Sequence, residues 1–415
     1  MSPNLVWQRQ LLPNGLTVIV YPRPSANTTQ MSLSVGYGSN QEPEEAAGIA
    51  HFLEHMLAGG STLRIHRSRG IEDWGGVLDF YTDREQVTAS LDVLPSKAVD
   101  AAEVIAELFF GGCFEEDKFL LERKIILNEL AEVADDPTVK VEELLLENLF
   151  RHHPIRRPVG GYCRTVKKLS LTQLTDEYRG NYVPKNMVLV VSGNIGSGNQ
   201  RKVSAPFEKL EFAGFTPKQH QPIEKGKPKP VAVEEKAGIT QSYLSIGART
   251  IPSTHKDAPA LDLISNLLGG GTSSRLFIEL REKNAVTYDV SAAHCKGSDF
   301  GYLGVSCAVG RGKVKKARAL ILKEFASLGA MLVSEVELEK AKQIMLGGVF
   351  RGMDNPHDSM EIINYMELQF QKEDALKNYL DKVRGVTVGD IQDAANRYLS
   401  RECLCTAILN PIKQR

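Results

Sequence analysis

The sequence predicts a protein of mixed helices and strands that is built from two copies of one domain. Its 415 residues exceed what one ordinary hydrophobic core holds, so two or three domains are expected. The sequence also repeats itself: residues 33–36 match residues 244–247, and residues 58–61 match residues 269–272, both 211 positions later. Similarity at a fixed offset without gaps is typical of a duplicated domain.

The overall charge is nearly balanced, with 50 basic and 51 acidic residues. A protein without a strong field of one sign has no electrostatic reason to bind nucleic acid or an anionic membrane, and we expect neither as a partner. The first residues contain no basic segment followed by an apolar run, and no later stretch approaches eighteen consecutive apolar residues. We therefore expect an unexported, cytoplasmic protein whose six scattered cysteines are reduced thiols.

The first half opens with a predicted hairpin around Asn14-Gly15, a dipeptide that favours the tightest hairpin turns. A third strand is expected over residues 31–36, and a loop over residues 37–47 leads to a helix. The other elements expected in this half are a segment over 71–80 that precedes a strand over 87–91, a strand over 187–193, and helices over 96–109, 115–133, 140–150 and 171–182.

The helix over residues 48–56 carries the first candidate site. Its apolar residues recur at helical spacing, so His51 and His55 lie one turn apart on one face with Glu54 beside them. Neutral imidazoles suit zinc, and a catalytic zinc site needs only one more protein ligand and a water. In this His-x-x-Glu-His order, Glu54 can accept a proton from the metal-bound water. The alternative is a polar helix face that carries two histidines by chance.

The helix over residues 115–133 offers the third ligand. Glu122 and Glu129 are seven residues apart and project in nearly the same direction, so either could complete the site. Glu132, one turn past Glu129, is the other acidic candidate close to that face. The alternative is a solvated helix face, on which glutamate is common.

A change of composition separates the two halves. Residues 212–230 are rich in Lys, Pro, Gln and Gly, and we expect a linker there between a domain at 1–211 and a domain at 231–415. In the second half we expect strands over 301–309 and 404–409 and helices over 314–328, 334–350, 360–370 and 375–383.

The second half is expected to repeat the fold without the metal chemistry. At the offset of 211 residues, other side chains occupy the positions of the three site residues: Asp262 corresponds to His51, Ser265 to Glu54, and Asn266 to His55. The glycine-rich segment over 269–276 has no Gly-Lys-Ser/Thr ending, which excludes a phosphate loop of that type.

A predicted helix-to-strand junction lies between Arg281 and Tyr288. The pair offers a cation and a phenol that could contact a substrate. The alternative from spacing alone is a surface arginine and a packed tyrosine.

Together these motifs resemble the pitrilysin/insulinase family of metallopeptidases, in its short, bacterial and mitochondrial-processing-peptidase-like branch. The resemblance covers the whole chain and rests on five segments in order: the Asn-Gly hairpin, Gly48-Ile-Ala-His-Phe-Leu-Glu-His-Met56, Glu122-Arg-Lys-Ile-Ile-Leu-Asn-Glu-Leu130, Ser274-Arg-Leu276, and Arg281-Glu282 through Tyr288. It implies two homologous α+β domains, each an antiparallel sheet packed with helices, that close as a clamshell over a peptide.

The resemblance also implies roles for the candidate residues. His51, His55 and Glu129 would bind one zinc ion per chain, with Glu54 as general base and Glu122 as a second catalytic residue that supports the site. Arg281 and Tyr288 would bind substrate main chain. One departure concerns the usual Gly-Gly-x-x-Asn-Ala-x-Thr motif, which here has Asp79 and Phe80 in place of Asn-Ala, beside the expected substrate-binding edge strand. These two residues put the subsite preference in question.

The expected function is therefore a zinc endopeptidase that hydrolyses peptides or short unfolded precursors in a chamber between the two domains. One alternative is a non-catalytic core or scaffold subunit with the same fold. The other is the metal-bearing subunit of a two-chain processing peptidase. Because the chain carries both the metal motif and the Arg/Tyr pair, we expect a self-sufficient homodimer, with a heterodimer with a homologous subunit as the alternative.

Overall fold

The computed structural model describes residues 7–111, 113–195, 198–208, 215, 221–224 and 226–412. They form two compact units, each of which is described by itself. Unit 1 comprises the described residues within 1–131, 158–219 and 350–376, and unit 2 those within 132–157, 220–349 and 377–415.

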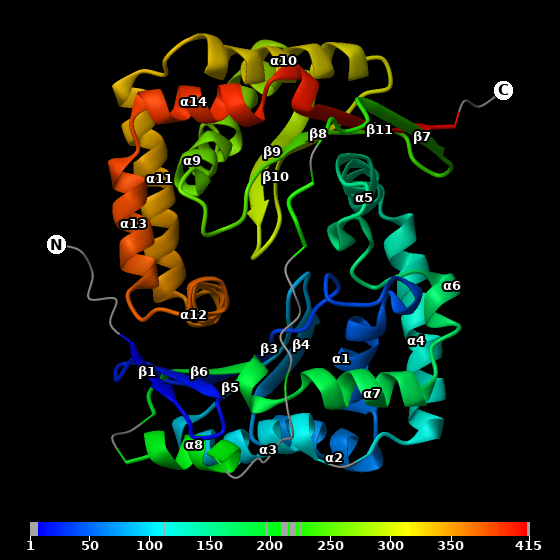
Figure 1. Cartoon of the computed structure of the whole chain (residues 1–415), viewed down its shortest axis with the longest axis vertical. Helices are drawn as coiled ribbons and strands as arrows, with labels where there is room; N and C mark the ends of the chain where they lie inside the picture. The colour runs from blue at the N-terminus through cyan, green and yellow to red at the C-terminus, as the bar shows by residue number, and fades with distance from the viewer. Residues whose placement is uncertain are drawn as a thin grey trace. The chain divides into compact units, whose positions relative to one another are not determined.

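Unit 1 is built on a six-stranded sheet with the strand order β1-β2-β6-β3-β5-β4 (Figure 1). Neighbouring strands are antiparallel except β2 and β6, which are parallel. The strands are β1 (Gln8–Leu11), β2 (Thr17–Pro22), β3 (Thr29–Val35), β4 (Val77–Thr82), β5 (Val87–Val93) and β6 (Met187–Gly193). Its helices are α1 (Ile49–Gly59), α2 (Thr62–Glu72), α3 (Ala98–Phe110), α6 (Cys163–Val166), α7 (Leu171–Asn181), α8 (Gln200–Glu208) and α12 (Pro356–Phe370).

Unit 2 contains a five-stranded sheet with the order β7-β11-β8-β10-β9. Its strands are β7 (Val231–Lys236), β8 (Ser242–Arg249), β9 (Thr287–Lys296), β10 (Gly301–Val309) and β11 (Leu404–Pro411), and β7 and β11 form the parallel pair. Its helices are α5 (Pro137–Leu149), α9 (Ala258–Gly269), a π-helix over Phe277–Lys283, α10 (Val314–Ala330) and α14 (Val388–Tyr398). Three further helices have residues in both units: α4 (Glu116–Asp135), α11 (Glu335–Asp354) and α13 (Ala375–Gly385).

The two sheets share one topology. A parallel pair, then three antiparallel pairings ending at an edge strand, describes β2-β6-β3-β5-β4 in unit 1 and β7-β11-β8-β10-β9 in unit 2. Strand β1 is an addition to the first sheet. The α+β class with two similar sheets, each packed with helices, is therefore confirmed, and the repeated strand order is what a duplication produces. The expectation of wholly antiparallel sheets was wrong, because each sheet contains one parallel pair.

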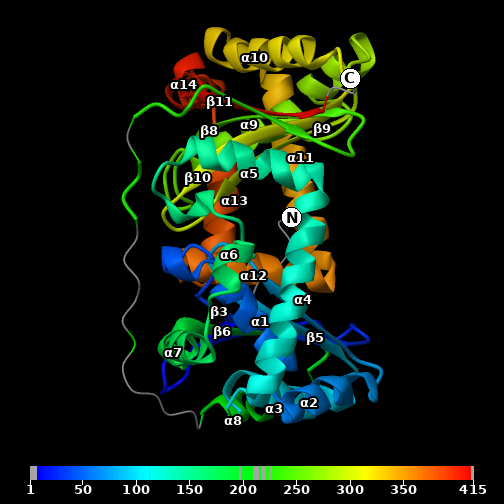
Figure 2. The same ribbon diagram turned by 90° about the vertical axis from the view of Figure 1, so that its right-hand side faces the viewer.

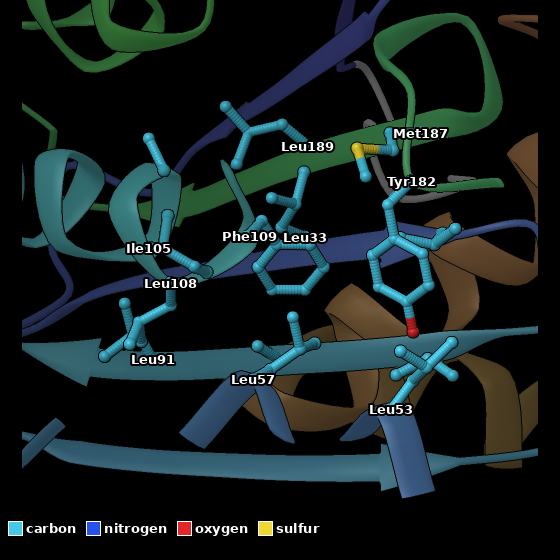
Figure 3. Packing of buried hydrophobic residues seen from close by; sticks show 14 of the residues in the cluster. Leu33, Leu53, Leu57, Leu91, Ile105, Leu108, Phe109, Tyr182, Met187 and Leu189 are labelled. Carbon is cyan, nitrogen blue, oxygen red and sulfur yellow. The ribbon is translucent and has the colours of Figure 1, made fainter. Parts of the chain in front are cut away.

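The core of unit 1 lies between its sheet and helices α1 and α3 (Figure 3). Leu53 and Leu57 of α1 and Phe109 of α3 are fully buried against residues such as Leu33 of β3 and Leu91 of β5. Apolar residues spaced at three and four positions give α1 the buried stripe that fixes its orientation on the sheet. That stripe leaves the histidine-bearing face of α1 directed away from the core.

Each unit takes a helix from the opposite half of the sequence. Helix α12, late in the chain, packs on β6 and β3 of unit 1, and α5, from the first half, packs on β11 and β8 of unit 2 (Figure 2). In unit 1 the contact includes a buried hydrogen bond of 2.8 Å from Asn364 Nδ2 to Ser32 Oγ. The compact units thus do not coincide with continuous halves of the sequence, and domain boundaries at 211 and 231 remain a prediction about the duplication.

The predicted linker at 212–230 lies largely outside the described residues. Its described part includes Glu224, whose carboxylate accepts hydrogen bonds from the backbone N–H groups of Arg151, His152 and His153 and from Arg249. These bonds lower the pKa of Glu224 although burial alone would raise it. The end of the segment is therefore bound to unit 2.

Several elements were not predicted from the sequence, among them α2, α14 and β7. Helix α2 has the sequence Thr-Leu-Arg-Ile-His-Arg-Ser-Arg-Gly-Ile-Glu, which buries only Arg64 and Ile71 and so shows no apolar stripe. Its first turn is stabilised by Ser61, which caps the N–H of Arg64 at 3.2 Å. No helix within the described residues is long and apolar enough to cross a membrane.

Candidate metal centre

Helix α1 begins under unusual constraints. Gly48 has φ +99°, and a Cβ there would lie 2.5 Å from the carbonyl oxygen of Gly160, so only glycine fits. The buried carboxylate of Glu42 accepts the N–H of Gly48 at 2.9 Å and that of Ala50 at 2.8 Å. Glu42 therefore accepts hydrogen bonds from free backbone donors at the start of α1, and its negative charge interacts favourably with the positive end of the helix dipole. These contacts fix the first turn, which carries His51.

His51, His55 and Glu129 are brought together by the packing of α4 against α1. The carboxylate of Glu129 lies 3.4 Å from Nε2 of His51 and 3.3 Å from Nε2 of His55. One ligand atom from each residue lies within 4.8 Å of the others, and this is the one such group of three found among the described residues. Glu129 rather than Glu122 thus faces both imidazole nitrogens.

The arrangement fits a zinc ion. Ligands about 2.1 Å from a tetrahedral ion are separated from each other by roughly 3.4 Å. The two distances from Glu129 match that separation, and the donor set of two imidazoles and one carboxylate is one that catalytic zinc uses.

Glu122 supports the site through His55. Its Oε2 lies 3.0 Å from Nδ1 of His55, which places the proton on Nδ1 and leaves the lone pair of Nε2 directed toward Glu129 and the ion position. The backbone of Gly59 makes room for this contact, because a Cβ at that position would collide with the carboxylate of Glu122.

Glu54 is hydrogen bonded to the edge strand of the sheet. Oγ1 of Thr82, the last residue of β4, donates to Oε2 of Glu54 over 2.6 Å. The nearby Tyr182 is buried, and burial together with the charge of Glu54 raises the pKa of its phenol well above the usual value. The neutral hydroxyl of Thr82 therefore holds Glu54 in place through one carboxylate oxygen, and the other oxygen is left for other contacts.

The electrostatics of the site favour a cation. Burial alone would lower the pKa of His55, but the hydrogen bond to Glu122 and the charges of Glu54 and Glu129 outweigh it and raise that pKa. The hydrogen bond from His51, together with the charges of both imidazoles, lowers the pKa of Glu129. Three carboxylates around two imidazoles form an environment that a divalent cation would neutralise.

Arg281 and Tyr288 lie side by side in unit 2. The guanidinium carbon of Arg281 lies 4.2 Å from the ring centre of Tyr288 and 4.8 Å from that of Phe277. The π-helix that carries Arg281 is followed by Ala285, which has φ 48°, a backbone conformation that costs free energy for a residue with a side chain. Tyr288 is 79% exposed, so its phenol is accessible, and the role of the two residues in binding substrate remains a prediction.

Two contributors were missed in the sequence. Thr82 is part of the motif that contains Asp79 and Phe80, but nothing in its spacing indicates a bond to Glu54, which is 28 positions earlier. Glu42 precedes Gly48 by six residues, farther than an ordinary helix cap, so its capping role depends on the path of the intervening loop.

Comparison with protein families gives two matches that together cover most of the chain. Residues 17–161 match the model described as "Insulinase (Peptidase family M16)". Residues 168–345 match the model described as "Peptidase M16 inactive domain". The boundary between the matches falls between the candidate metal ligands and the Arg281/Tyr288 pair.

Individual proteins are similar over nearly the whole chain. A protein of Mycobacterium leprae named as an uncharacterized zinc protease is 30% identical over 97% of this chain and 91% of its own length. A probable mitochondrial-processing peptidase subunit beta of Arabidopsis thaliana is 26% identical over 97% of this chain and 78% of its own length. The crystal structure of a protease from Helicobacter pylori, at 22% identity, has the same fold, with a TM-score of 0.90 over 98% of this chain and 99% of that one.

Proposed function

Because the chain belongs to the insulinase family of peptidases, family M16, we propose that it is a zinc-dependent endopeptidase acting on peptides or short unfolded precursors. The observation that supports this most is the convergence of His51, His55 and Glu129 on one position, with Glu54 beside it. A scaffold subunit has no need of three metal-ligating side chains with matched separations, so the peptidase is favoured over the non-catalytic alternative.

The residues divide the chemistry among them. When bound, zinc supplies a Lewis acid that polarises the scissile carbonyl and acidifies a water molecule. His51, His55 and Glu129 would hold it, and Glu122 would keep His55 in the tautomer that presents Nε2. Glu54 would accept a proton on its carboxylate during attack and later donate it to the leaving amine. The hydrogen bond from Thr82 would orient Glu54 for both steps.

The edge strand β4 offers a place for the substrate backbone. Among the strands of the described residues it pairs only with β5, so its other edge offers backbone groups that an extended peptide can bind. Arg281 and Tyr288 would bind further main-chain or side-chain groups of the peptide. We also propose one zinc ion per chain, a homodimer and a cytoplasmic location. Light scattering of the purified protein tests the oligomeric state.

The decisive experiment replaces Glu54 with glutamine. Glu54→Gln keeps the shape of the side chain and all three metal ligands, so zinc content should remain near one per chain while kcat falls by about 100-fold to 10,000-fold. Glu132→Gln, a change of the same kind at an exposed position on α4, serves as control and should leave kcat and zinc content unchanged. A Glu54→Gln protein that keeps a large share of wild-type turnover would contradict the assignment. Full zinc content without turnover in the wild type would favour the scaffold.

A further inference from the structure

A pocket of about 380 Å³ opens beside the metal centre in unit 1. Four elements form its walls: α1 with Glu54 and His55, α2 with Ile65 and Arg69, β4 with Leu78 and Phe80, and α4 with Glu122. Because the pocket shares Glu54 with the site and β4 with the proposed substrate edge, a peptide cleaved there would place a group next to its scissile bond into this pocket. The inference rests on the proposed function.

The pocket has small residues at one end and apolar walls. Ala58 and Gly59 of α1 leave space beside the metal centre, and Phe80 of β4 contributes an aromatic ring to the wall. Leu78 and Phe80 pack against the core of unit 1 with part of their surface exposed. The pocket therefore has room for a side chain of several carbons.

Arg69 is the charged lining residue without a partner. Within the described part of the chain, no hydrogen bond or ion pair involves its guanidinium, and its side chain is exposed. Two carboxylates of the pocket each have one hydrogen-bonding partner: Glu54 with Thr82, and Glu122 with His55. Arg69 is the cation of the pocket wall and is available for an anion.

The remaining acidic residue of the lining, Asp79, belongs to the other face of the strand. Alternation along β4 places Asp79 on the side of Tyr81, whose hydroxyl donates to Glu361 of α12, and opposite to Leu78 and Phe80. The carboxylate of Asp79 accepts the N–H of Phe80 at 3.0 Å. Asp79 still lines the pocket, but among the described residues no ion pair joins its carboxylate to Arg69.

We propose that this pocket selects a carboxylate next to the scissile bond and that Arg69 is the residue that determines this specificity. Two sources supply such a group: the side chain of Glu or Asp, and the C-terminal carboxylate of a short peptide. An arginine can bind either with paired N–H donors. The apolar walls favour the longer methylene chain of Glu over Asp.

The experiment compares quenched fluorescent peptides that differ at one position. Glu, Gln or Lys is placed in turn at each of the two residues that flank the scissile bond, with both ends blocked. The wild type should cleave the Glu peptide with a kcat/KM about five- to tenfold above the Gln peptide, and the Lys peptide slowest. Arg69→Met should remove the difference, and Arg69→Glu should reverse it.

Arg67→Met is the matched control. Arg67 is on the same helix but is bound outside the pocket, to Glu107, with Nε 2.6 Å from Oε2. This variant should keep the wild-type preference. A second set of peptides, ending one residue past the scissile bond as free acid or as amide, separates the sources: a preference for the free acid in the Gln background identifies the terminal carboxylate.

Three results discriminate the proposals. Equal kcat/KM for Glu, Gln and Lys, or a preference for Lys, overturns the role of Arg69 while leaving the peptidase intact. Absence of cleavage of every peptide by zinc-loaded wild type refutes the proposed function instead. In that case the Kd of the same peptides for the Glu54→Gln protein, measured by fluorescence anisotropy, decides the inference: tighter binding of the Glu peptide, lost in Arg69→Met, supports it, and equal binding overturns it.

Discussion

Helices α1 and α9 both lie near the edge strand of their sheet, at positions related by the 211-residue offset, but their polar side chains are used differently. In unit 1, His51 and His55 face Glu129, whose side chain is 42% exposed. In unit 2, Asp262 replaces His51 and accepts hydrogen bonds from His294 at 2.7 Å, from Lys296 at 2.6 Å and from the hydroxyl of Tyr379. The side chains of Asp262 and His294 are 8% and 0% exposed.

The difference shows that the same position of a repeated fold can carry side chains arranged for binding in one copy and for stability in the other. The donors and acceptors around Asp262 bond to one another, and His294 also bonds Thr250 at 3.0 Å. These groups are therefore already hydrogen bonded within the protein and are not available to a ligand. The site on α1 instead directs lone pairs toward a shared, accessible position. A metal centre needs such groups left unsatisfied by the protein, whereas a buried ionic cluster must be satisfied from within.

Replacing the third ligand should break the unit 1 site most severely. Glu129→Gln removes the carboxylate that faces both imidazoles, so zinc affinity should fall by more than the 10- to 100-fold typical of a supporting residue. Metal content by atomic absorption after dialysis measures the loss. Glu132→Gln is the control on the same helix. Metal lost in Glu132→Gln but kept in Glu129→Gln would show that the third ligand is misassigned.

The corresponding change in unit 2 should affect stability alone. Asp262→Asn leaves Lys296 buried without its anion, which should lower the free energy of unfolding by about 3 kcal/mol with zinc content unchanged. Denaturant unfolding followed by circular dichroism measures the loss. Asp381→Asn, which breaks an exposed pair with Arg384, should cost little. A loss of zinc in Asp262→Asn would contradict the separation of roles.

Glu122→Gln should produce an intermediate effect in unit 1. The amide can still contact His55 but no longer stabilises its imidazole by charge, so activity should fall by roughly 10- to 100-fold while most of the zinc is retained. Parallel measurement of kcat and metal content separates this supporting role from that of a ligand. Zinc loss equal to that of Glu129→Gln would make Glu122 a ligand instead.

In unit 2, Arg281 is expected to act on substrate rather than on folding. Arg281→Ala should raise KM about tenfold with zinc content and thermal midpoint unchanged, because a charged hydrogen-bond donor to the peptide is lost. Lys283→Ala, on the same π-helix and paired with Glu279, is the control. An unchanged KM would restrict Arg281 to stacking on Tyr288.

The smallest expected effect is an acid sensitivity of unit 2. Burial lowers the pKa of His294 below its usual 6.5, and the bonds to His294 and Lys296 lower that of Asp262 although burial opposes them. Both shifts mean that the unfolded chain binds more protons, so stability should fall as pH drops below 6.5, and again below the usual range of aspartate. Unfolding midpoints from pH 7 to pH 4 test this, and His294→Gln should lack the first part.

Part of the fold was determined by local sequence. Residues near Asn14-Gly15 form the hairpin of β1 and β2, and the strand predicted at 187–193 is β6, because turn chemistry and continuous apolar runs act over short distances. Helix α2 could not be predicted, since it is stabilised by a cap at Ser61 and contacts distant in sequence rather than by an apolar stripe. The exchange of α5 and α12 between the halves of the chain also leaves no local pattern.

For the site, the sequence alone determined that His51, Glu54 and His55 share one region of a helix, because a spacing of four residues fixes their relative direction. Spacing alone left Glu122 and Glu129 equivalent, since both point the same way from α4, and the choice of Glu129 came from the family resemblance. The docking of α4 on α1 gives the physical reason for the difference: the two residues are about 10 Å apart along the helix axis, and that displacement places Glu122 at Nδ1 of His55 and Glu129 at both Nε2 atoms. Periodicity fixes direction around a helix, but position along it is set by tertiary packing.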